Sequence, residues 1–249
     1  MIARRATLAV FVLFGLAARA TGQDVMPPAI PALTWRPIAL GAGVVGLALF
    51  FDARIAREVQ AHATSGSVQT ATTLDRFGEP VVFVPVIGGL ALAGVIAHRP
   101  AVTRTAARTA GAIILAAAIT QASKYLVGRS RPSQDPDLSA SDFAPFSGRT
   151  SFPSGHSAAA FALATSLGDA SDNTLARIGL YTLATGTAYG RITASKHWLS
   201  DVLAGAGVGI ISAKFAAGKI RIFGLQAPNV LIGPRGGALS WTVDLPRTH

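Results

Sequence analysis

The sequence predicts an all-α fold, a helical bundle of about six core helices in a polytopic membrane protein, with a short β-hairpin-like tail at the C-terminus. Half of the 249 residues are hydrophobic and only 14% are charged. The mean hydropathy is +0.45, which lies far to the apolar side of soluble proteins. The apolar residues fall into separate uncharged stretches, and the chain is long enough for one domain but short for two.

The N-terminus has the features of an export signal at residues 1–20. Arg4 and Arg5 precede an uncharged stretch at 6–18, and Ala18 and Ala20 supply small residues for signal-peptidase cleavage. An uncleaved signal anchor is the alternative, because the flanking composition fits both. Residues 21–36 contain several prolines and form a linker that cannot continue a helix. The folded helical body is then expected at 37–222, followed by a tail at 223–249.

Six apolar stretches are candidates for the core helices. They cover residues 37–51, 80–97, 109–123, 157–168, 178–190 and 202–213. Only 80–97 reaches the roughly 18 uncharged residues of a confident membrane span, so the others need polar end residues to cross. Residues 52–60 and 70–77 fit short amphipathic helices at the membrane interface.

Positive charge orients this bundle. Basic residues lie between the second and third stretches and again after the sixth, which places both sites on the cytoplasmic side; they are His98, Arg99, Arg104, Arg108, Lys214, Lys219 and Arg221. The third and fifth stretches then end outside, and the fourth and sixth begin there. A cleaved signal together with a membrane-spanning first stretch would place the mature N-terminus on the wrong side for this orientation. We therefore expect either that the signal is not cleaved or that residues 37–51 do not span the membrane.

The net charge and the absence of cysteine limit the ligands and the reactions that fit this chain. The net charge of +10 fits an anionic lipid surface, a phosphorylated substrate or nucleic acid. The absence of cysteine excludes disulfides, thiolate chemistry and Cys-ligated metals. In the tail, Val230 and Ile232 precede a turn at 233–237, and Leu239, Trp241, Val243 and Leu245 then recur at every second residue. This pattern predicts a hairpin with a packing or docking role.

The first of three polar segments follows the third apolar stretch. Gly128 can end that helix, and Pro132 favours an extended Arg131, so Lys124 and Arg131 can converge on one anion. Taken alone, such a basic cluster more often anchors lipid headgroups.

The second segment leads directly into the fourth apolar stretch. Ser154 can cap that helix or donate through its hydroxyl, and Gly155 allows a ligand to approach the backbone. Free N–H groups at the helix start would bind phosphate oxygens, with His156 beside them as a proton donor. A simple capped turn is the alternative.

The third segment contains Arg191, His197 and Asp201. A spacing of four places His197 and Asp201 on one face of a helix, where the carboxylate accepts the imidazole N–H. The other ring nitrogen then keeps a lone pair and can act as a nucleophile. A surface His/Asp pair is the alternative, but ionisable groups at a membrane-helix boundary are usually functional. Trp198 suits a membrane interface or a substrate contact.

Together the three segments resemble the signature motifs of the type 2 phosphatidic acid phosphatase (PAP2) superfamily. They read Lys124-x6-Arg131-Pro132, Pro153-Ser154-Gly155-His156 and Arg191-x5-His197-x3-Asp201. The superfamily includes class A acid phosphatases and vanadium haloperoxidases, and the resemblance covers about residues 38–220. One position departs from the pattern, because Gly190 stands where the family usually has Ser.

The resemblance implies a PAP2-type catalytic domain and a role for each motif residue. Lys124, Arg131, Ser154, Gly155 and Arg191 would bind phosphate, while His197 attacks, Asp201 orients His197, and His156 protonates the leaving group. Three fixed cations and a helix N-terminus can neutralise the transferred phosphoryl group, so no metal and no cofactor is expected.

We therefore expect a metal-independent phosphatase that acts on a phosphorylated lipid such as phosphatidate, a polyprenyl diphosphate or a lipid A phosphate. It would lie in a bacterial-type inner membrane with its site facing the periplasm, and nucleic acid is not an expected partner. The alternatives are a soluble periplasmic class A acid phosphatase, a vanadium haloperoxidase, and a non-catalytic protein that binds or moves phospholipids.

Overall fold

The computed structural model describes residues 31–227, 229–233 and 236–240. The expected export signal at 1–20, most of the linker, and Trp241, Val243 and Leu245 lie outside these residues. The elements are α1 (Trp35–Ala61), α2 (Ser65–Asp75), η1 (Arg76–Gly78), α3 (Pro80–Ile96), α4 (Pro100–Val127), η2 (Pro132–Gln134), α5 (Gly155–Asp169), α6 (Thr174–Thr193), α7 (Leu199–Ala216), β1 (Asn229–Gly233) and β2 (Gly236–Ser240). The boundaries proposed at 36/37 and 222/223 stay predictions.

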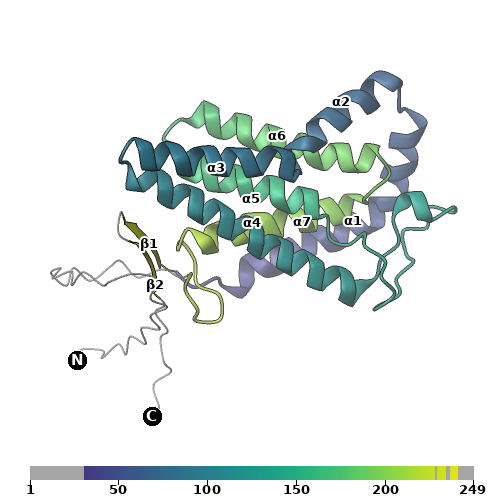
Figure 1. Cartoon of the computed structure of the whole chain (residues 1–249). Helices are drawn as coiled ribbons and strands as arrows, with labels where there is room; N and C mark the ends of the chain where they lie inside the picture. The colour runs from purple at the N-terminus through teal and green to yellow at the C-terminus, as the bar shows by residue number, and fades with distance from the viewer. Residues whose placement is uncertain (1–30, 228, 234–235, 241–249) are drawn as a thin grey trace, which may run out of the picture.

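The helical bundle is confirmed, and each of the six apolar stretches lies in a helix of its own (Figure 1). The separate interfacial helix expected at 52–60 is wrong, because α1 continues unbroken to Ala61. Asp52 does not end the apolar helix at a membrane surface, since its carboxylate is fully buried and paired with Arg129. Residues 70–77 form the end of α2 and most of η1, which pack against α6.

Helix α5 occupies the centre of the bundle and packs against α4, α6 and α7. A Cβ atom at Gly205 of α7 would lie 2.3 Å from the carbonyl oxygen of Ser154, and one at Gly209 would lie 2.3 Å from that of Ala158. Small residues four apart let two helices approach this closely. The contact places the beginning of α7 directly beside the beginning of α5.

Three of the described helices are long and apolar enough to cross a membrane, namely α1, α4 and α7. The segment Ser65–Gly78 and α3 form a fourth candidate span when they are taken together. These two parts are bent by 42° at their junction. Helix α3 has only 17 residues and does not qualify alone, whereas α1, α4 and α7 extend past their uncharged stretches. Large apolar side chains on α1 and α3 are exposed, including Phe50, Val81 and Leu92, as expected of surfaces that face lipid.

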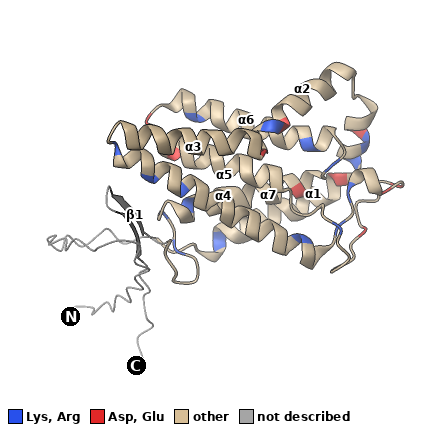
Figure 2. Cartoon of the chain, in the orientation of Figure 1, with Lys and Arg blue, Asp and Glu red and all other residues tan. Residues whose placement is uncertain are grey.

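The four helix ends that carry the motifs meet at one end of the bundle, which we call the motif end. Here α4 and α6 end and α5 and α7 begin. The third and fifth apolar stretches therefore end on the same side on which the fourth and sixth begin, as the positive charges predicted. The basic residues of the α3–α4 turn and those after α7 lie at the opposite end. Figure 2 shows the uncharged middle of α4 between the two.

The expected C-terminal hairpin is confirmed for the backbone. Strands β1 and β2 pair antiparallel, with Val230 opposite Leu239 and Gly233 opposite Gly236. The hairpin lies beside α4 at the end away from the motifs (Figure 1).

Candidate active site

Backbone hydrogen bonds join the three motif segments. The N–H of Ser151 donates to the carbonyl of Arg129 at 3.0 Å, and the N–H of Ser154 donates to the carbonyl of Asp201 at 2.9 Å. The first and third segments are joined by Ser133, whose N–H donates to the carbonyl of Ser195 at 3.1 Å. Residues far apart in the sequence are therefore held in one rigid cluster.

The first segment has the conformation that its sequence predicts. Gly128 ends α4 with a φ of 58°, and a Cβ atom there would lie 1.8 Å from the carbonyl oxygen of Ala144. Arg131 is extended, with φ −80° and ψ 156°. The ammonium of Lys124 lies 3.6 Å from the position of a Cβ atom on Gly155. Lys124 is thus directly beside the beginning of α5.

The second segment forms the N-terminus of α5. Ser154 is the N-cap residue, is fully buried, and accepts hydrogen bonds from the N–H and the hydroxyl of Ser157 at 3.4 and 3.0 Å. Because both bonds are accepted, the hydroxyl hydrogen of Ser154 can still be donated. Gly155 and His156 open the helix, and the His156 side chain is about one third exposed.

The third segment departs from the expected helical pair, because His197 lies before α7 rather than in it. Trp198 is the N-cap, and Asp201 reaches back from the first turn to accept its N–H at 2.9 Å. His197 Nδ1 nevertheless faces Asp201 Oδ2 at 3.5 Å, with both side chains buried. The two side chains thus lie within ion-pair distance, but Nδ1 makes no hydrogen bond among the described residues, and their approach arises from a helix cap. Trp198 is 1% exposed and donates Nε1–H to the carbonyl of Ser130, so the expected interface position is wrong.

Sequence reasoning missed a buried charge network behind His197. Arg129 donates at 2.7 Å to Asp201, Asp52, Ser200 and the carbonyl of Ala140. Asp52 also accepts the N–H of Ser200 at 2.8 Å. Arg129, Asp52 and Asp201 are each at most 1% exposed. A charged residue just after an apolar stretch was the available signal for Asp52, since intramembrane charges are rarely incidental.

The electrostatic environment of His197 favours the neutral imidazole. Burial lowers the pKa of His197, the Asp201 carboxylate opposes this effect, and the positive charges of Arg191 and Arg131 add to it. The buried Nε–H groups of Arg131 and Arg191 have no hydrogen-bond partner among the described residues. Buried donors are normally satisfied, so an oxyanion bound beside His197 would complete both.

Two carboxylates that the sequence did not single out line the other side of the site. Asp75 at the end of α2 accepts a hydrogen bond from Arg191 at 2.7 Å, and Glu79 lies 3.9 Å from His156 Nε2. Asp75, Glu79 and His156 each offer an atom within 4.8 Å of the others, so this group could hold a metal ion. One oxygen of Asp75 is already occupied by Arg191.

The departure at Gly190 has a steric cause. A Cβ atom at this position would lie 2.5 Å from the carbonyl oxygen of Ala71 in α2. A serine would therefore push α2 away from α6, and α2 carries the carboxylate of Asp75 to Arg191. The glycine allows the close packing that delivers this ion pair.

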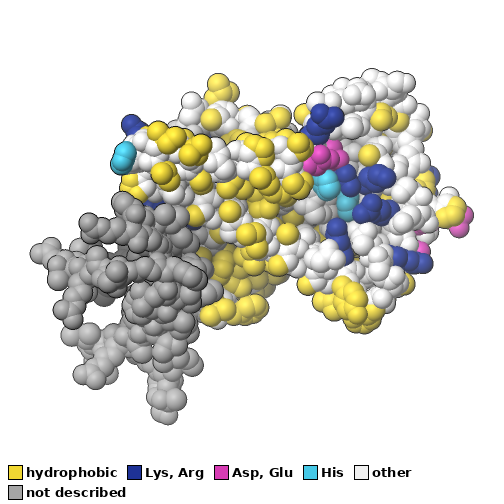
Figure 3. Space-filling model, in the orientation of Figure 1, with side chains coloured by type: hydrophobic (Ala, Val, Ile, Leu, Met, Phe, Trp, Pro, Cys, Tyr) yellow, Lys and Arg dark blue, Asp and Glu magenta, His cyan; other side chains and the backbone are white. Residues whose placement is uncertain are grey.

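The site therefore combines three cations, a helix N-terminus, a buried imidazole and a second, partly exposed imidazole. Figure 3 shows basic, histidine and acidic side chains gathered in one place on the surface at the motif end. Such a site can bind a tetrahedral oxyanion, offer an uncharged nitrogen nucleophile to it, and supply a proton. All eight residues predicted for the site lie at this end.

Comparison with known proteins gives the same family as the motifs. Residues 105–221 match the family model of the PAP2 superfamily. The lipid A 1-phosphatase of Porphyromonas gingivalis (strain ATCC 33277) is 41% identical over 95 residues, which are 37% of this chain and 19% of that protein. The chain thus spans about a fifth of the length of this curated relative.

Two solved structures share the fold. LpxE of Aquifex aeolicus has a TM-score of 0.53 and 23% identity, covering 67% of this chain and 94% of that one. A transmembrane PAP2 type phosphatidylglycerolphosphate phosphatase from Bacillus subtilis has a TM-score of 0.59 and 19% identity, covering 74% and 96%. At these identities the likeness establishes the helical membrane fold.

Proposed function

Because the chain belongs to the PAP2 superfamily, we propose that it is a membrane phosphatase that removes a phosphate group from a phosphorylated lipid. The similarity to a lipid A 1-phosphatase supports this substrate class, and the helices apolar enough to cross a membrane favour a lipid over a soluble ester. The candidate substrates are phosphatidate, a polyprenyl diphosphate and a lipid A phosphate.

The observation that carries the proposal is the pair of unpaired guanidinium donors beside a buried imidazole. The Nε–H groups of Arg131 and Arg191 lack partners among the described side chains, and their charges act on His197. Phosphoryl transfer spreads negative charge over three equatorial oxygens, which fixed cations can neutralise. Lys124, the hydroxyl group of Ser154 and the N–H of Gly155 at the start of α5 supply the remaining contacts.

In the first step, His197 Nε2 attacks phosphorus in line and the bond from phosphorus to the ester oxygen breaks. Asp201 at Nδ1 keeps the lone pair on Nε2 and stabilises the positive charge that develops on the ring. His156 transfers its proton to the departing alkoxide. Burial and the positive charge of Arg191 lower the pKa of His156, whereas the carboxylates of Asp75 and Glu79 oppose this effect and favour the protonated form that this step needs.

In the second step, neutral His156 accepts a proton from water as the oxygen attacks phosphorus. The P–N bond to His197 breaks, inorganic phosphate leaves, and both imidazoles return to their initial states. The reaction consumes one water and requires no other reactant.

We further propose that the motif end faces the periplasm of a bacterial-type inner membrane. Support comes from the charge distribution, since Arg99, Arg104, Arg108, Lys214 and Lys219 lie near the start of α4 or the end of α7, at the opposite end of the bundle. Clusters of Lys and Arg directly beside membrane helices are typical of cytoplasmic connections.

A substrate panel tests the function. Purified full-length protein in mixed micelles is assayed for phosphate release from lipid A, phosphatidate, a polyprenyl diphosphate and p-nitrophenyl phosphate. We expect at least one lipid to have a higher kcat/KM than the soluble ester. Faster turnover of the soluble ester than of every lipid would instead support the acid phosphatase alternative.

Removal of divalent metal should leave the activity unchanged. Side-chain cations and a helix N-terminus replace the metal that other phosphoryl-transfer enzymes use. The measurement is the initial rate before and after dialysis against a chelator. A loss that one added cation restores would assign an essential ion to Asp75, Glu79 and His156 and would contradict the mechanism.

The acidic limb of the pH profile should lie below pH 6.5, the ordinary value for histidine. Burial lowers the pKa of His197, so the ring stays neutral at pH values where an exposed histidine is already protonated. As the pH falls through the lowered pKa, Nε2 gains a proton and the nucleophile is lost.

This prediction is measured as kcat/KM with p-nitrophenyl phosphate across acidic and neutral pH. Return to neutral pH must restore the full rate, so that unfolding is separated from protonation. An acidic limb with its midpoint above pH 6.5 would show that another group controls the step.

A further inference from the structure

A second polar cavity lies at the end of the bundle opposite the motifs. Its volume is about 450 Å³, and it is lined by the beginning of α4, the end of α5 and the segment that follows α7. Its polar lining comes from Arg104, Thr105, Arg108, Ser166, Asp169 and Lys219. None of these residues takes part in the reaction described above.

The charges in this cavity are unbalanced. Lys214 and Lys219 bind Asp169 at 2.8 and 3.0 Å, so the carboxylate is already compensated by two lysines. Arg104 and Arg108 are exposed, and neither has a carboxylate within ion-pair distance in the described part of the chain. The cavity therefore carries an excess of positive charge that the described fold does not use.

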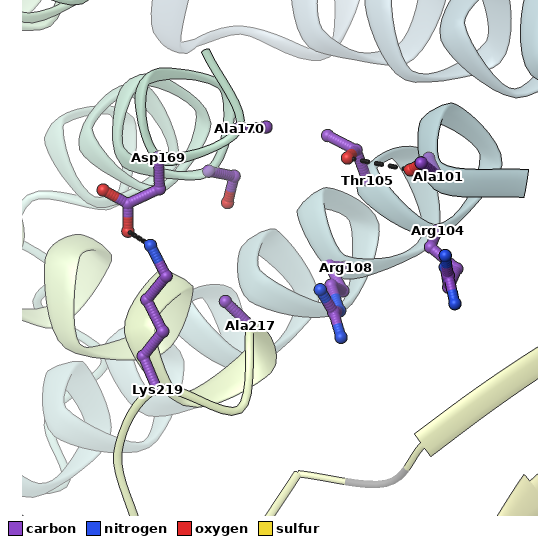
Figure 4. Close-up of a pocket in the computed structure, with 9 residues that line it drawn as sticks. Ala101, Arg104, Thr105, Arg108, Asp169, Ala170, Ala217 and Lys219 are labelled. Carbon is purple, nitrogen blue, oxygen red and sulfur yellow. Dashed lines mark hydrogen bonds and ion pairs between the residues drawn. The ribbon is translucent and has the colours of Figure 1, made fainter. Parts of the chain in front are cut away.

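The two arginines also repel each other. They are four residues apart on α4, so they share one face of the helix, and like charges at this spacing are unfavourable. Figure 4 shows both side chains extending from the same side of α4, with the Asp169–Lys219 pair across the cavity. Arg104 lies in the second turn of α4 and Arg108 in the third. An anion between them would remove the repulsion.

The walls of the cavity suit a lipid better than a soluble anion. Ala101, Ala170 and Ala217 complete its lining. Val95 and Ile96, at the end of α3 just before α4 begins, are 60% and 67% exposed. A headgroup in the cavity would thus have an apolar surface nearby along which acyl chains can pack. Basic pockets between membrane helices at the cytoplasmic side bind acidic lipid headgroups.

We propose that this cavity binds the phosphate headgroup of an anionic phospholipid in the leaflet opposite the catalytic end. Arg104 and Arg108 contact the phosphate oxygens, and Ser166 offers a hydroxyl group. The lipid is a bound ligand and not a substrate, because no nucleophile or proton donor of the catalytic site is near.

The test is equilibrium binding of fluorescent phosphatidylglycerol to full-length protein in micelles of a neutral detergent, with labelled phosphatidylcholine for comparison. The variant Arg104→Gln/Arg108→Gln should weaken phosphatidylglycerol binding about 30-fold, or about fivefold for each charge. Lipid bound at the motif end contributes equally to every protein compared, because that end is unchanged.

The matched control is Arg36→Gln/Arg99→Gln. These two arginines are exposed and lie at the same end of the bundle, but they do not line the cavity. Binding should be retained in this control. An equal loss of phosphatidylglycerol binding in both double variants would show that general surface charge causes the effect, and it would overturn the proposal.

Two further outcomes would also overturn it. Equal binding of phosphatidylglycerol and phosphatidylcholine would exclude charge recognition, and full competition by an equal concentration of glycerol phosphate would identify a soluble anion as the ligand. Should the arginine variant fail to fold, Ala170→Phe fills the cavity from an exposed position without changing charge. It should likewise weaken binding, and unchanged binding in a folded Ala170→Phe protein would contradict the site.

Discussion

Replacement of His197 by alanine is expected to lower phosphate release by about 10⁴-fold or more, because the variant lacks the nitrogen that attacks phosphorus. The side chain is 1% exposed and faces Asp201, so no neighbouring group can take its place without a rearrangement. The measurement is kcat for lipid and soluble substrates with purified protein. Substrate binding should change much less than kcat, because the cations remain.

His62→Ala is the matched control. His62 is exposed at the end of α1, and its Nδ1 lies 2.9 Å from the carbonyl of Glu58 in the same helix. This variant should keep the wild-type rate. Equal rates for His197→Ala and wild type would defeat the nucleophile assignment.

His156→Ala separates the two proposed histidine roles. A substrate with a good leaving group can still phosphorylate His197, but the water step slows because its base is missing. An acid-labile phosphoenzyme should then accumulate from labelled p-nitrophenyl phosphate. Failure to trap it in a variant that still turns over slowly would argue against a covalent intermediate.

The motif residues could be located from the sequence because each motif lies at a helix end and contains residues that are typical of helix ends. Gly128 predicted the end of α4 and Ser154 the beginning of α5, and both have those positions. The spacing of His197 and Asp201 was ambiguous, however. Four residues fit one helical face, but they also fit a capping arrangement, and the chain uses the second.

The carboxylates around the site could not be predicted in the same way. Asp52 is 77 residues from Arg129, and Asp75 is 116 residues from Arg191. Their pairing depends on how α1 and α2 pack against the rest of the bundle. The meaning of Gly190 was hidden for the same reason, since its neighbour Ala71 belongs to α2.

Arg129→Leu is the second change expected to have a large effect. The guanidinium lies between the buried carboxylates of Asp52 and Asp201 and also contacts the rings of Phe143 and Trp198 at 5.1 and 5.3 Å. Removing it leaves two buried negative charges without a counter-charge. Breaking such a buried pair costs about 3–5 kcal/mol, so the variant should lose much of its thermal stability in detergent.

Arg149→Leu is the control for this change. Arg149 also pairs with an aspartate, Asp142, but that pair is exposed, with side-chain exposures of 38% and 45%. Exposed pairs contribute little to stability because water and salt screen them. The melting temperature should therefore stay near that of the wild type, and an equal loss in both variants would contradict the special importance of the buried network.

Arg129→Lys distinguishes a structural role from a role in positioning Asp201. Lysine keeps the positive charge but cannot form the planar contacts that let one guanidinium donate to Asp52 and Asp201 together. The protein should fold, yet the Asp201 carboxylate would be held less firmly against His197. We expect kcat to fall about 10- to 100-fold with KM nearly unchanged, by analogy with the loss of outer groups that orient a metal-ligating histidine. Wild-type kcat in a folded Arg129→Lys protein would confine Arg129 to stability alone.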